Sequence, residues 1–564
     1  MDTQRIVALM VFSFSAFLLW DGWQKHNLPK TPPTAMLPAK ASNSGTALPV
    51  PSATPTPPAG TTLADAGARM GLDATQAQAS GKSIKVRNDK MEVELNTQGA
   101  DVRRVTLLQH TSATEKDKPL VILQPKEGHY FVTQTGLLEG LPNHNSVYDT
   151  TAADYELKQG QDKFEVKFVN RDSPGVEVTK TYLFHTGSYV IDISYEIKNN
   201  TDNTLSPVAY YQFVRDGNPP EGQAAQSNPF TGVATFTGPA VYTDEKKFVK
   251  VDFSDIDKGK QNFAKKASDG WLAMVQHYFV AAWLPKQGLE REYFARKLGD
   301  HLYGAGVIVP AGQVASNQTT SVSVPLYVGP QEQDKLRDLA PGFDLVVDYG
   351  WLTVIAVPLF WLLKFIHGFV GNWGWSIVVM TILIKVVFFP LNQKAGKSMA
   401  HMKAMAPRIE QLRQRYGDDK VKLNQAMMEL YRTEKINPLG GCLPIVVQIP
   451  VFIALYWVLL AAIELRHTPW VGWIQDLSSP DPYYILPLIM AVSMFIQTKL
   501  NPPPPDPVQA KVMLFMPIVF SIFFFFFPAG LVLYWTVQNI IGIGQQWLIN
   551  KTVEAHIQAK PAKR

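Results

Sequence analysis

The sequence predicts a polytopic α-helical membrane protein with six spans, a signal anchor plus a five-span core, that also carries a large exported antiparallel β-sandwich domain and a cytoplasmic helical hairpin. Three observations predict this fold class. A short apolar run lies near the start, two-residue alternation fills the middle, and long apolar runs fill the C-terminal third. The mean hydropathy of −0.04 averages these unlike regions, so each is interpreted by itself.

The composition excludes an intramolecular disulfide framework, because the chain has a single cysteine, Cys442. The net charge of +5 is modest, and many of the basic residues gather in residues 394–435 and 551–564. These clusters lie beside apolar runs, so they bear on membrane topology more than on nucleic acid, and no nucleic-acid substrate is expected.

The first element is the apolar run of residues 6–20, which follows Arg5. No small-residue cleavage pattern follows it, and Trp20 and Trp23 suit a membrane interface. We therefore expect residues 1–23 to form an uncleaved signal-anchor transmembrane helix, with a removed signal peptide as the alternative. Residues 24–82 are rich in Pro, Ala, Ser and Thr and are expected to form a flexible linker.

Residues 83–340 are expected to form one exported β-sandwich. Apolar residues alternate with polar ones in several runs, for example Phe164, Val166 and Phe168, and turn-forming residues separate the runs. Histidines occur in this region, among them His110, His129 and His277, but their spacing matches no catalytic mechanism, so we expect them to be packing or surface residues.

Residues 341–371 are apolar enough to span a membrane. The number of membrane crossings that the distribution of basic residues allows nevertheless predicts an interfacial helix. The loop after Pro390, residues 391–437, has ten basic and five acidic residues, which favours the cytoplasm. If the amino terminus is also cytoplasmic and the sandwich is exported, only one span can lie between the sandwich and this loop. Residues 372–390 are the better candidate for that second span.

Residues 391–437 are expected to form a helical hairpin. Apolar residues recur at three- and four-residue steps from Met399 to Tyr416 and from Leu423 to Tyr431, with Gly417 between the stripes. The methionines either pack the hairpin itself or offer a pliable surface to apolar segments, and both alternatives stay open. The expected contact residues are Met399, Met402, Met405, Met427 and Met428.

The remaining spans follow from hydropathy. Counted from a cytoplasmic amino terminus, they put the hairpin, the proline-rich turn and the basic tail on the cytoplasmic side. The expected segments are transmembrane helix 3 at 438–463, a periplasmic loop at 464–482, helix 4 at 483–500, a cytoplasmic turn at 501–511, helix 5 at 512–527, helix 6 at 528–550 and the tail at 551–564.

Lys385 is a charged residue inside the second expected span, where burial costs at least a few kcal/mol unless the ammonium finds a partner, water or the interface. It either snorkels to the cytoplasmic headgroups or lies in a wet cavity. Uncharged polar residues on this span and on the other spans favour a cavity. The polar residues at issue are Thr381, Gln448, Gln497, Trp535, Gln538 and Asn539.

Several long motifs, in one order along nearly the whole chain, closely resemble the YidC/Oxa/Alb family of membrane-protein insertases, and the exported sandwich marks its Gram-negative form. These motifs are residues 371–377 (Gly-Asn-Trp-Gly-Trp-Ser-Ile), 416–419 (Tyr-Gly-Asp-Asp), 436–442 (Ile-Asn-Pro-Leu-Gly-Gly-Cys), 481–487 (Asp-Pro-Tyr-Tyr-Ile-Leu-Pro) and 528–535 (Pro-Ala-Gly-Leu-Val-Leu-Tyr-Trp).

The resemblance implies a multi-pass protein of the cell inner membrane that inserts, folds and assembles integral membrane proteins without covalent chemistry, cofactor or metal. It implies nascent membrane proteins, the Sec translocon, the ribosome and membrane lipids as partners. In this family a hydrophilic groove carries a basic residue, usually Arg, and the matching residue here is Lys385. A lysine keeps the positive charge but lacks the paired donors with which a guanidinium group binds two acceptor atoms. The implied substrate contacts are Thr381, Phe452, Tyr534 and Trp535.

Two other classes of function compete with this one. A solute or ion transporter would use Lys385 as an anion-binding charge, but the spans show no internal repeat. A membrane-anchored sugar-binding or sugar-isomerising enzyme would place its site in the sandwich, and a fold alone carries no activity.

Overall fold

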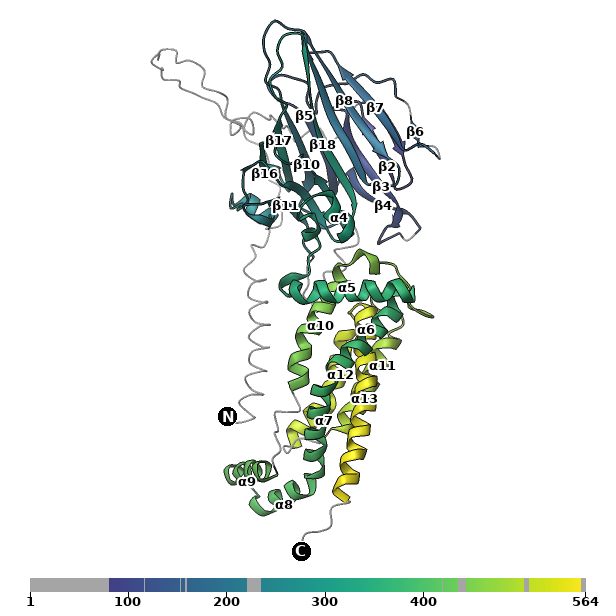
Figure 1. Cartoon of the computed structure of the whole chain (residues 1–564), viewed down its shortest axis with the longest axis vertical. Helices are drawn as coiled ribbons and strands as arrows, with labels where there is room; N and C mark the ends of the chain where they lie inside the picture. The colour runs from purple at the N-terminus through teal and green to yellow at the C-terminus, as the bar shows by residue number, and fades with distance from the viewer. Residues whose placement is uncertain are drawn as a thin grey trace, which may run out of the picture. The chain divides into compact units, whose positions relative to one another are not determined.

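The computed structural model describes residues 81–115, 117–152, 154–157, 160–220, 235–417, 419–434, 443–501 and 507–558. The expected signal anchor and nearly all of the expected linker lie outside the described residues. The described part contains a β-rich domain followed by a set of helices (Figure 1).

The β-rich domain consists of two sheets, as the alternating sequence predicted. All strand pairs in them are antiparallel except β1 with β6, among the strands described. The ten-stranded sheet has the order β13 (Lys266–Ala267), β16 (Arg291–Gly299), β17 (Leu302–Pro310), β10 (Val208–Asp216), β5 (His129–Leu137), β4 (Pro119–Lys126), β3 (Asp101–Thr111), β2 (Met91–Asn96), β1 (Ser83–Arg87) and β6 (Tyr155–Glu156). The eight-stranded sheet has the order β12 (Lys247–Lys250), β11 (Gly238–Thr243), β14 (Trp271–Gln276), β15 (Phe279–Trp283), β18 (Gln318–Pro330), β9 (Val190–Asn199), β8 (Val176–His185) and β7 (Lys163–Asn170).

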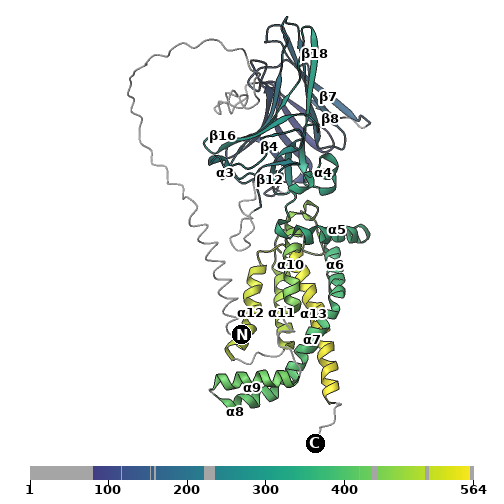
Figure 2. The same ribbon diagram turned by 60° about the vertical axis from the view of Figure 1, so that its left-hand side comes forward.

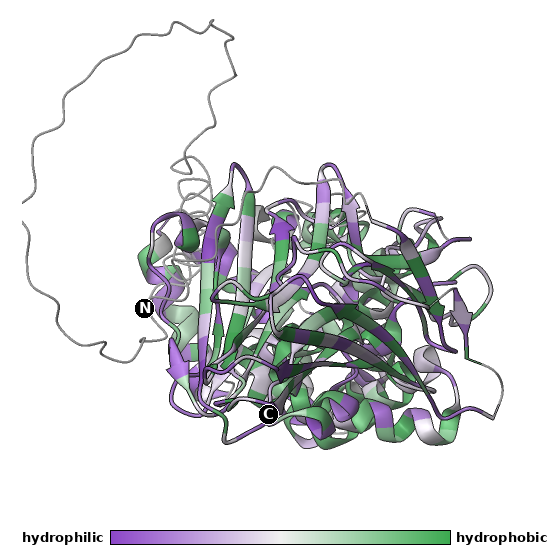
Figure 3. Cartoon of the chain, turned by 90° about the horizontal axis from the view of Figure 1, so that it is seen from above, coloured by the Kyte–Doolittle hydropathy of each residue, from purple (hydrophilic) through white to green (hydrophobic). Residues whose placement is uncertain are grey.

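Side-chain alternation explains why these strands form a sandwich. Along β8, every second residue is buried, from Val176 to Phe184, so one face of the strand packs on the core. Figure 3 shows hydrophilic and hydrophobic residues alternating along several strands. Strands β14 and β15 are buried at every position, which suits strands covered on both faces.

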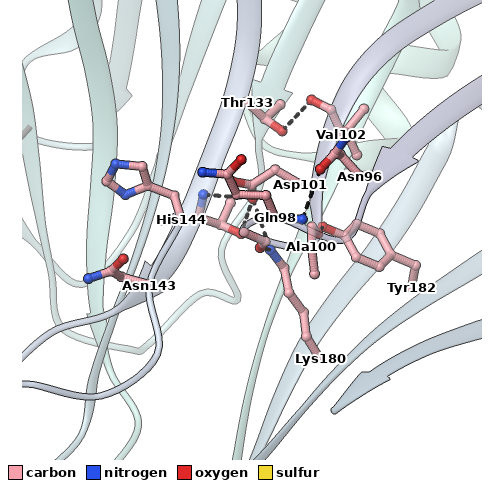
Figure 4. Close-up of polar contacts among 12 residues, drawn as sticks. Asn96, Gln98, Ala100, Asp101, Val102, Thr133, Asn143, His144, Lys180 and Tyr182 are labelled. Carbon is pink, nitrogen blue, oxygen red and sulfur yellow. Dashed lines mark hydrogen bonds and ion pairs between the residues drawn. The ribbon is translucent and has the colours of Figure 1, made fainter. Parts of the chain in front are cut away.

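A buried ion pair links the two sheets inside this core (Figure 4). Lys180 Nζ on β8 lies 2.9 Å from Asp101 Oδ1 on β3 and donates to the Gly99 carbonyl at 2.8 Å. The Asp101 carboxylate also accepts hydrogen bonds from the Thr135 amide and hydroxyl. Because the ammonium and the carboxylate each have further hydrogen-bond partners, the pair is tolerated in a core that excludes water.

Among the described helices, α3 lies between β12 and β13, and the others follow the sandwich along the chain. They are α3 (Phe253–Asp257), α4 (Gln333–Leu339), the short η1 (Phe343–Val346) and η2 (Gly350–Leu352), α5 (Thr353–Val370), α6 (Trp373–Val387), α7 (Phe389–Ala404), α8 (Ala406–Tyr416), α9 (Lys420–Thr433), α10 (Leu443–Ala461), η4 (Ile463–Leu465), α11 (Ile485–Leu500), α12 (Pro507–Phe524) and α13 (Ala529–Gln558). Among them, the segment Gly350–Val370 is long and apolar enough to cross a membrane by length and composition. The segments Trp373–Val387 and Phe389–Ala404 pass the same test only together, across a bend of 68°, and Val446–Ala461, Ile485–Leu500 and Lys511–Phe524 are shorter apolar helices.

Helix α5 differs from the other apolar helices in its direction. In Figures 1 and 2 it lies across the direction along which α6, α10 and α13 run. One side of α5 is buried, including Phe360 and Leu363, while Trp361 and Phe369 are exposed. Length and hydropathy alone do not separate a span from an interfacial helix here, but this arrangement is one that an interfacial helix would have.

Two of the sequence motifs contain a polar residue that accepts hydrogen bonds from backbone amides at the start of a helix. Asn372 accepts a hydrogen bond from the Trp375 amide and so begins α6. Asp481 is buried before α11, where its carboxylate accepts from the Leu486 amide at 2.7 Å and from the Trp473 indole at 3.1 Å. Both polar residues satisfy backbone donors that would otherwise be unpaired at a helix start.

The hairpin region contains three helices where the sequence suggested two. The expected first stripe is divided at Met405, between α7 and α8, because Pro407 begins a new helix. Helices α8 and α9 run antiparallel, since Arg408 near the start of α8 lies 2.6 Å from Glu434 just after α9. The hairpin is therefore formed by α8 and α9, and α7 continues from the bend after α6.

Candidate functional site

Lys385 lies near the end of α6 at a point where three helices meet. A β-carbon placed on Gly542 of α13 would lie 3.6 Å from Lys385 Nζ and 3.3 Å from Gln497 Nε2 of α11. Lys385 is half-buried, and none of the ion pairs between described residues includes it. The absence of a side chain at Gly542 thus leaves room for the ammonium beside uncharged polar groups.

Besides the polar group around Lys385, a second set of polar contacts joins α10 to α13. Gln448 Nε2 donates to the Tyr534 hydroxyl at 3.2 Å. One turn further along α10, the Phe452 ring meets Trp535 edge-on, with ring centroids 4.6 Å apart. Tyr534 is buried whereas Phe452 and Trp535 are half-buried, so the aromatic pair offers part of its surface to a neighbour.

A third set of polar contacts joins α11 to α13. Asn539 Nδ2 donates to Ser493 Oγ at 3.2 Å, and both residues are buried. Beside it, the Oε1 atom of Gln538 is buried and accepts no hydrogen bond from any described residue. An unpaired buried acceptor is costly, so this amide is a candidate partner for a water or a substrate group.

Thr381 occupies a different environment from the one the sequence suggested. It is fully buried, and its hydroxyl donates to the Ile377 carbonyl of its own helix at 2.7 Å. In this conformation Thr381 packs against neighbours, and its hydroxyl is not offered to a ligand.

A cavity of about 710 Å³ lies beside Lys385, between α13 and the bend that joins α6 to α7. It includes Lys385, but the other residues expected in the groove are not part of its lining. The lining residues are Ile382, Lys385, Val386, Phe389, Gln393, Lys397, His401, Ile541, Gly544, Gln545, Leu548, Ile549, Thr552 and Val553. Sequence reasoning missed Lys397 and His401, because the bend that aligns them with Lys385 is a tertiary feature.

The methionines of the hairpin region are divided between packing and exposure. Met399, Met402, Met405 and Met427 are half-buried, whereas Met428 is 62% exposed. The second apolar stripe is the half-buried side of α9, and it consists of Leu423, Met427, Leu430 and Tyr431. This distribution is compatible with both alternatives, methionines that pack the hairpin and methionines that offer a surface to apolar segments.

The three sandwich histidines named from the sequence lie in packed or half-buried positions. The His110 ring packs edge-on against Phe279, with centroids 5.2 Å apart, and burial lowers the pKa of His110 to about 4. Burial likewise lowers the pKa of His277 to about 4, and its ring stacks on Tyr278. His129 is half-buried at the start of β5. Within the described residues, no group of three or more potential ligand side chains could hold a metal ion.

Comparison with known proteins matches two family models along the chain. Residues 83–362 match the YidC periplasmic domain, and residues 365–556 match the 60Kd inner membrane protein family. A membrane protein insertase YidC of Aromatoleum aromaticum is 52% identical over 564 residues, covering 100% of both chains. One of Dechloromonas aromatica is 50% identical over 558 residues, covering 98% of both chains.

Among solved structures, a crystal structure of an active YidC insertase with its first transmembrane domain resolved covers 83% of this chain and 92% of its own. Its sequence is 17% identical, and the TM-score is 0.39. The two family models and the full-length relatives establish the family by themselves. The chain therefore belongs to the YidC family of membrane protein insertases, and it is an inner membrane protein with a periplasmic β-rich domain.

Proposed function

We propose that this chain inserts, folds and assembles integral membrane proteins, alone or with the Sec translocon, along a hydrophilic path between its membrane helices. The observation that carries the proposal is the meeting of Lys385, Gln497 and Gly542 from three apolar helices, with no acidic partner for the lysine among the described residues. An uncompensated charge at membrane depth is costly, so its retention calls for a functional reason.

The proposed mechanism is physical and forms no covalent bond. The polar and often acidic tail of an arriving single-span protein has to pass through hydrocarbon, and a wet path at half depth shortens that passage. Lys385 attracts the tail as a point charge, which a lysine provides as well as an arginine. Burial of about 20 apolar residues of the substrate in the bilayer then supplies the driving force.

The apolar side of this path is assigned to Phe452 and Trp535. Their edge-on contact leaves both rings half-buried between α10 and α13. A hydrophobic segment of the substrate would slide past these rings into lipid, while its polar tail stays near Lys385. Gln448 and Tyr534, hydrogen-bonded to each other, hold α10 and α13 in the register that presents the rings.

The proposed topology has six spans, with α5 at the periplasmic interface and with α8, α9 and the basic tail in the cytoplasm. The direction of α5 and its exposed aromatic residues support the interfacial assignment. The excess of basic residues in residues 391–437 supports a cytoplasmic hairpin. There, the exposed Met428 and its half-buried neighbours would receive nascent chains from the ribosome.

Photocrosslinking tests the path. A photoreactive residue replaces Gln497, which is half-buried, and, in a separate variant, replaces Val492 of the same helix, which is 60% exposed. The two positions lie about 140° apart around α11. With ribosomes stalled on a single-span membrane protein, we expect crosslinks to the nascent span from position 497 and few from position 492. Equal labelling from both positions, or none from position 497, would remove the proposed path.

A further inference from the structure

Apart from Lys385, none of the residues that line the cavity has a role in the proposed insertion path. The cavity is formed where α6 ends and α7 begins, across a bend of 68°, and α13 runs beside both helices (Figure 2). Pro390, in the first turn of α7, lacks the amide that would continue α6, which accounts for the bend. The recess between the bend and α13 is the cavity.

One part of the cavity is apolar and faces outward. Val386, Phe389 and Leu548 line it and are 64%, 48% and 59% exposed, as residues in contact with acyl chains would be. Ile549 and Val553 pack with Ala400 of α7 and close the inner side. A hydrocarbon chain therefore has a continuous apolar surface on which to lie.

The other part of the cavity carries positive charge. Lys397 and His401 are exposed and one turn apart on α7, and Lys385 lies at the far end of the same lining. No acidic residue is part of this lining. The Nε2 atom of Gln545, also in the lining, is shielded from solvent and donates to no acceptor in the part of the chain that the structure describes. The ammonium groups of the two lysines, the His401 imidazole and an unused donor together suit an anionic group with several acceptor oxygens.

We propose that this cavity binds one anionic glycerophospholipid of the cytoplasmic leaflet. Its phosphate would lie against Lys397 and His401, with Gln545 as a further donor, and its acyl chains would follow Val386, Phe389 and Leu548. A volume of about 710 Å³ falls within the size range of pockets for small molecules, so it suits a headgroup with the first part of its chains better than a peptide helix. The inference rests on the topology proposed above, which puts this end of α7 at the cytoplasmic surface.

The test uses the full-length protein purified in detergent and measures bound lipid by native mass spectrometry during titration with phosphatidylglycerol or phosphatidylcholine. Lys397→Gln removes one cation, and a basic residue near an anionic lipid contributes roughly fivefold in binding. We therefore expect roughly fivefold weaker retention of phosphatidylglycerol, with phosphatidylcholine unchanged. The matched control is Lys403→Gln, on the same helix but about 120° away and outside the lining.

A second variant fills the cavity without changing its charge. Gly544 is in the lining, and a β-carbon added there meets no atom within 4 Å, so Gly544→Leu should fold and occupy the apolar part. We expect it to lower phosphatidylglycerol retention while leaving thermal stability intact.

Equal losses in Lys397→Gln and Lys403→Gln, equal retention of the two lipids, or unchanged retention in Gly544→Leu would overturn the lipid site. Crosslinking from position 497 is the separate readout of the insertion path. If it persists while lipid retention fails these tests, the lipid site falls and the proposed function stands.

Discussion

Gly542→Asp tests whether Lys385 acts as a point charge, because it neutralises the lysine without removing it. The added β-carbon would lie 3.6 Å from Lys385 Nζ, so its carboxylate reaches ion-pair distance. The nearest obstacle, Gln497 Nε2 at 3.3 Å, is the end of a side chain and can shift by a few tenths of an ångström. Gly542→Asn has nearly the same shape and no charge, which makes it the matched control.

The size of the effect follows from the distance. Two unit charges about 4 Å apart attract by about 1 kcal/mol in water and by about 4 kcal/mol at an effective dielectric constant near 20. The new carboxylate would take this attraction away from an arriving acidic tail. Since about 1 kcal/mol corresponds to roughly a fivefold change in binding, we expect insertion of a substrate with an acidic tail to fall at least about fivefold.

Protease protection of the exported tail, measured with inverted inner-membrane vesicles that contain each variant, reports insertion. Gly542→Asp should insert the acidic-tail substrate as poorly as Lys385→Gln, and Gly542→Asn should stay near the unmodified protein. A substrate with its tail acids changed to Asn and Gln should insert equally in all of them. If Gly542→Asp and Gly542→Asn behave alike, Lys385 does not act through its charge.

Two further predictions concern the periplasmic domain, and both are measured by unfolding of the full-length protein. Lys180→Met leaves the buried Asp101 carboxylate unpaired and should destabilise the domain by about 3–5 kcal/mol, whereas adding Asp101→Asn should recover part of the loss. Arg171→Met, at an exposed ion pair, should cost about 1 kcal/mol or less, and a similar cost at both sites would contradict this account. Because burial lowers the pKa of His110 to about 4, the unfolded chain binds more protons than the folded one between pH 6.5 and 4, so stability should fall by about 1–3 kcal/mol as the pH drops through that window. His110→Gln should lessen this fall, and an unchanged pH profile would contradict the assignment.

Local patterns predicted much of this molecule. The alternation of Phe164, Val166 and Phe168 with polar residues predicted the inward face of β7, where Val166 and Phe168 are buried. The stripe of Leu423, Met427, Leu430 and Tyr431 predicted the half-buried side of α9. These predictions succeeded because strands and helices have fixed side-chain periods, which an apolar pattern reveals without knowledge of the partner.

Contacts between helices were not predictable in the same way. Gln448 and Tyr534 are 86 residues apart, and their hydrogen bond depends on how α10 packs against α13. Likewise, Asp101 and Lys180 are 79 residues apart, and no local pattern joins a single acid on one strand to a single lysine on another. The sequence puts Thr381 on the same helix face as Lys385, but it does not reveal that the Thr381 hydroxyl donates to the Ile377 carbonyl of its own helix.

The sequence by itself determined the order of the parts, an apolar start, an alternating sandwich and a helical membrane region, and it identified Lys385 as a charge in need of an explanation. Only the tertiary structure decided which groups surround that charge. Gly542 makes room for the ammonium, Gln497 lies beside it, and the bend at Pro390 brings Lys397 and His401 into the same cavity lining. The physical reason is that helix packing, and not residue order, sets the distance between side chains on different helices.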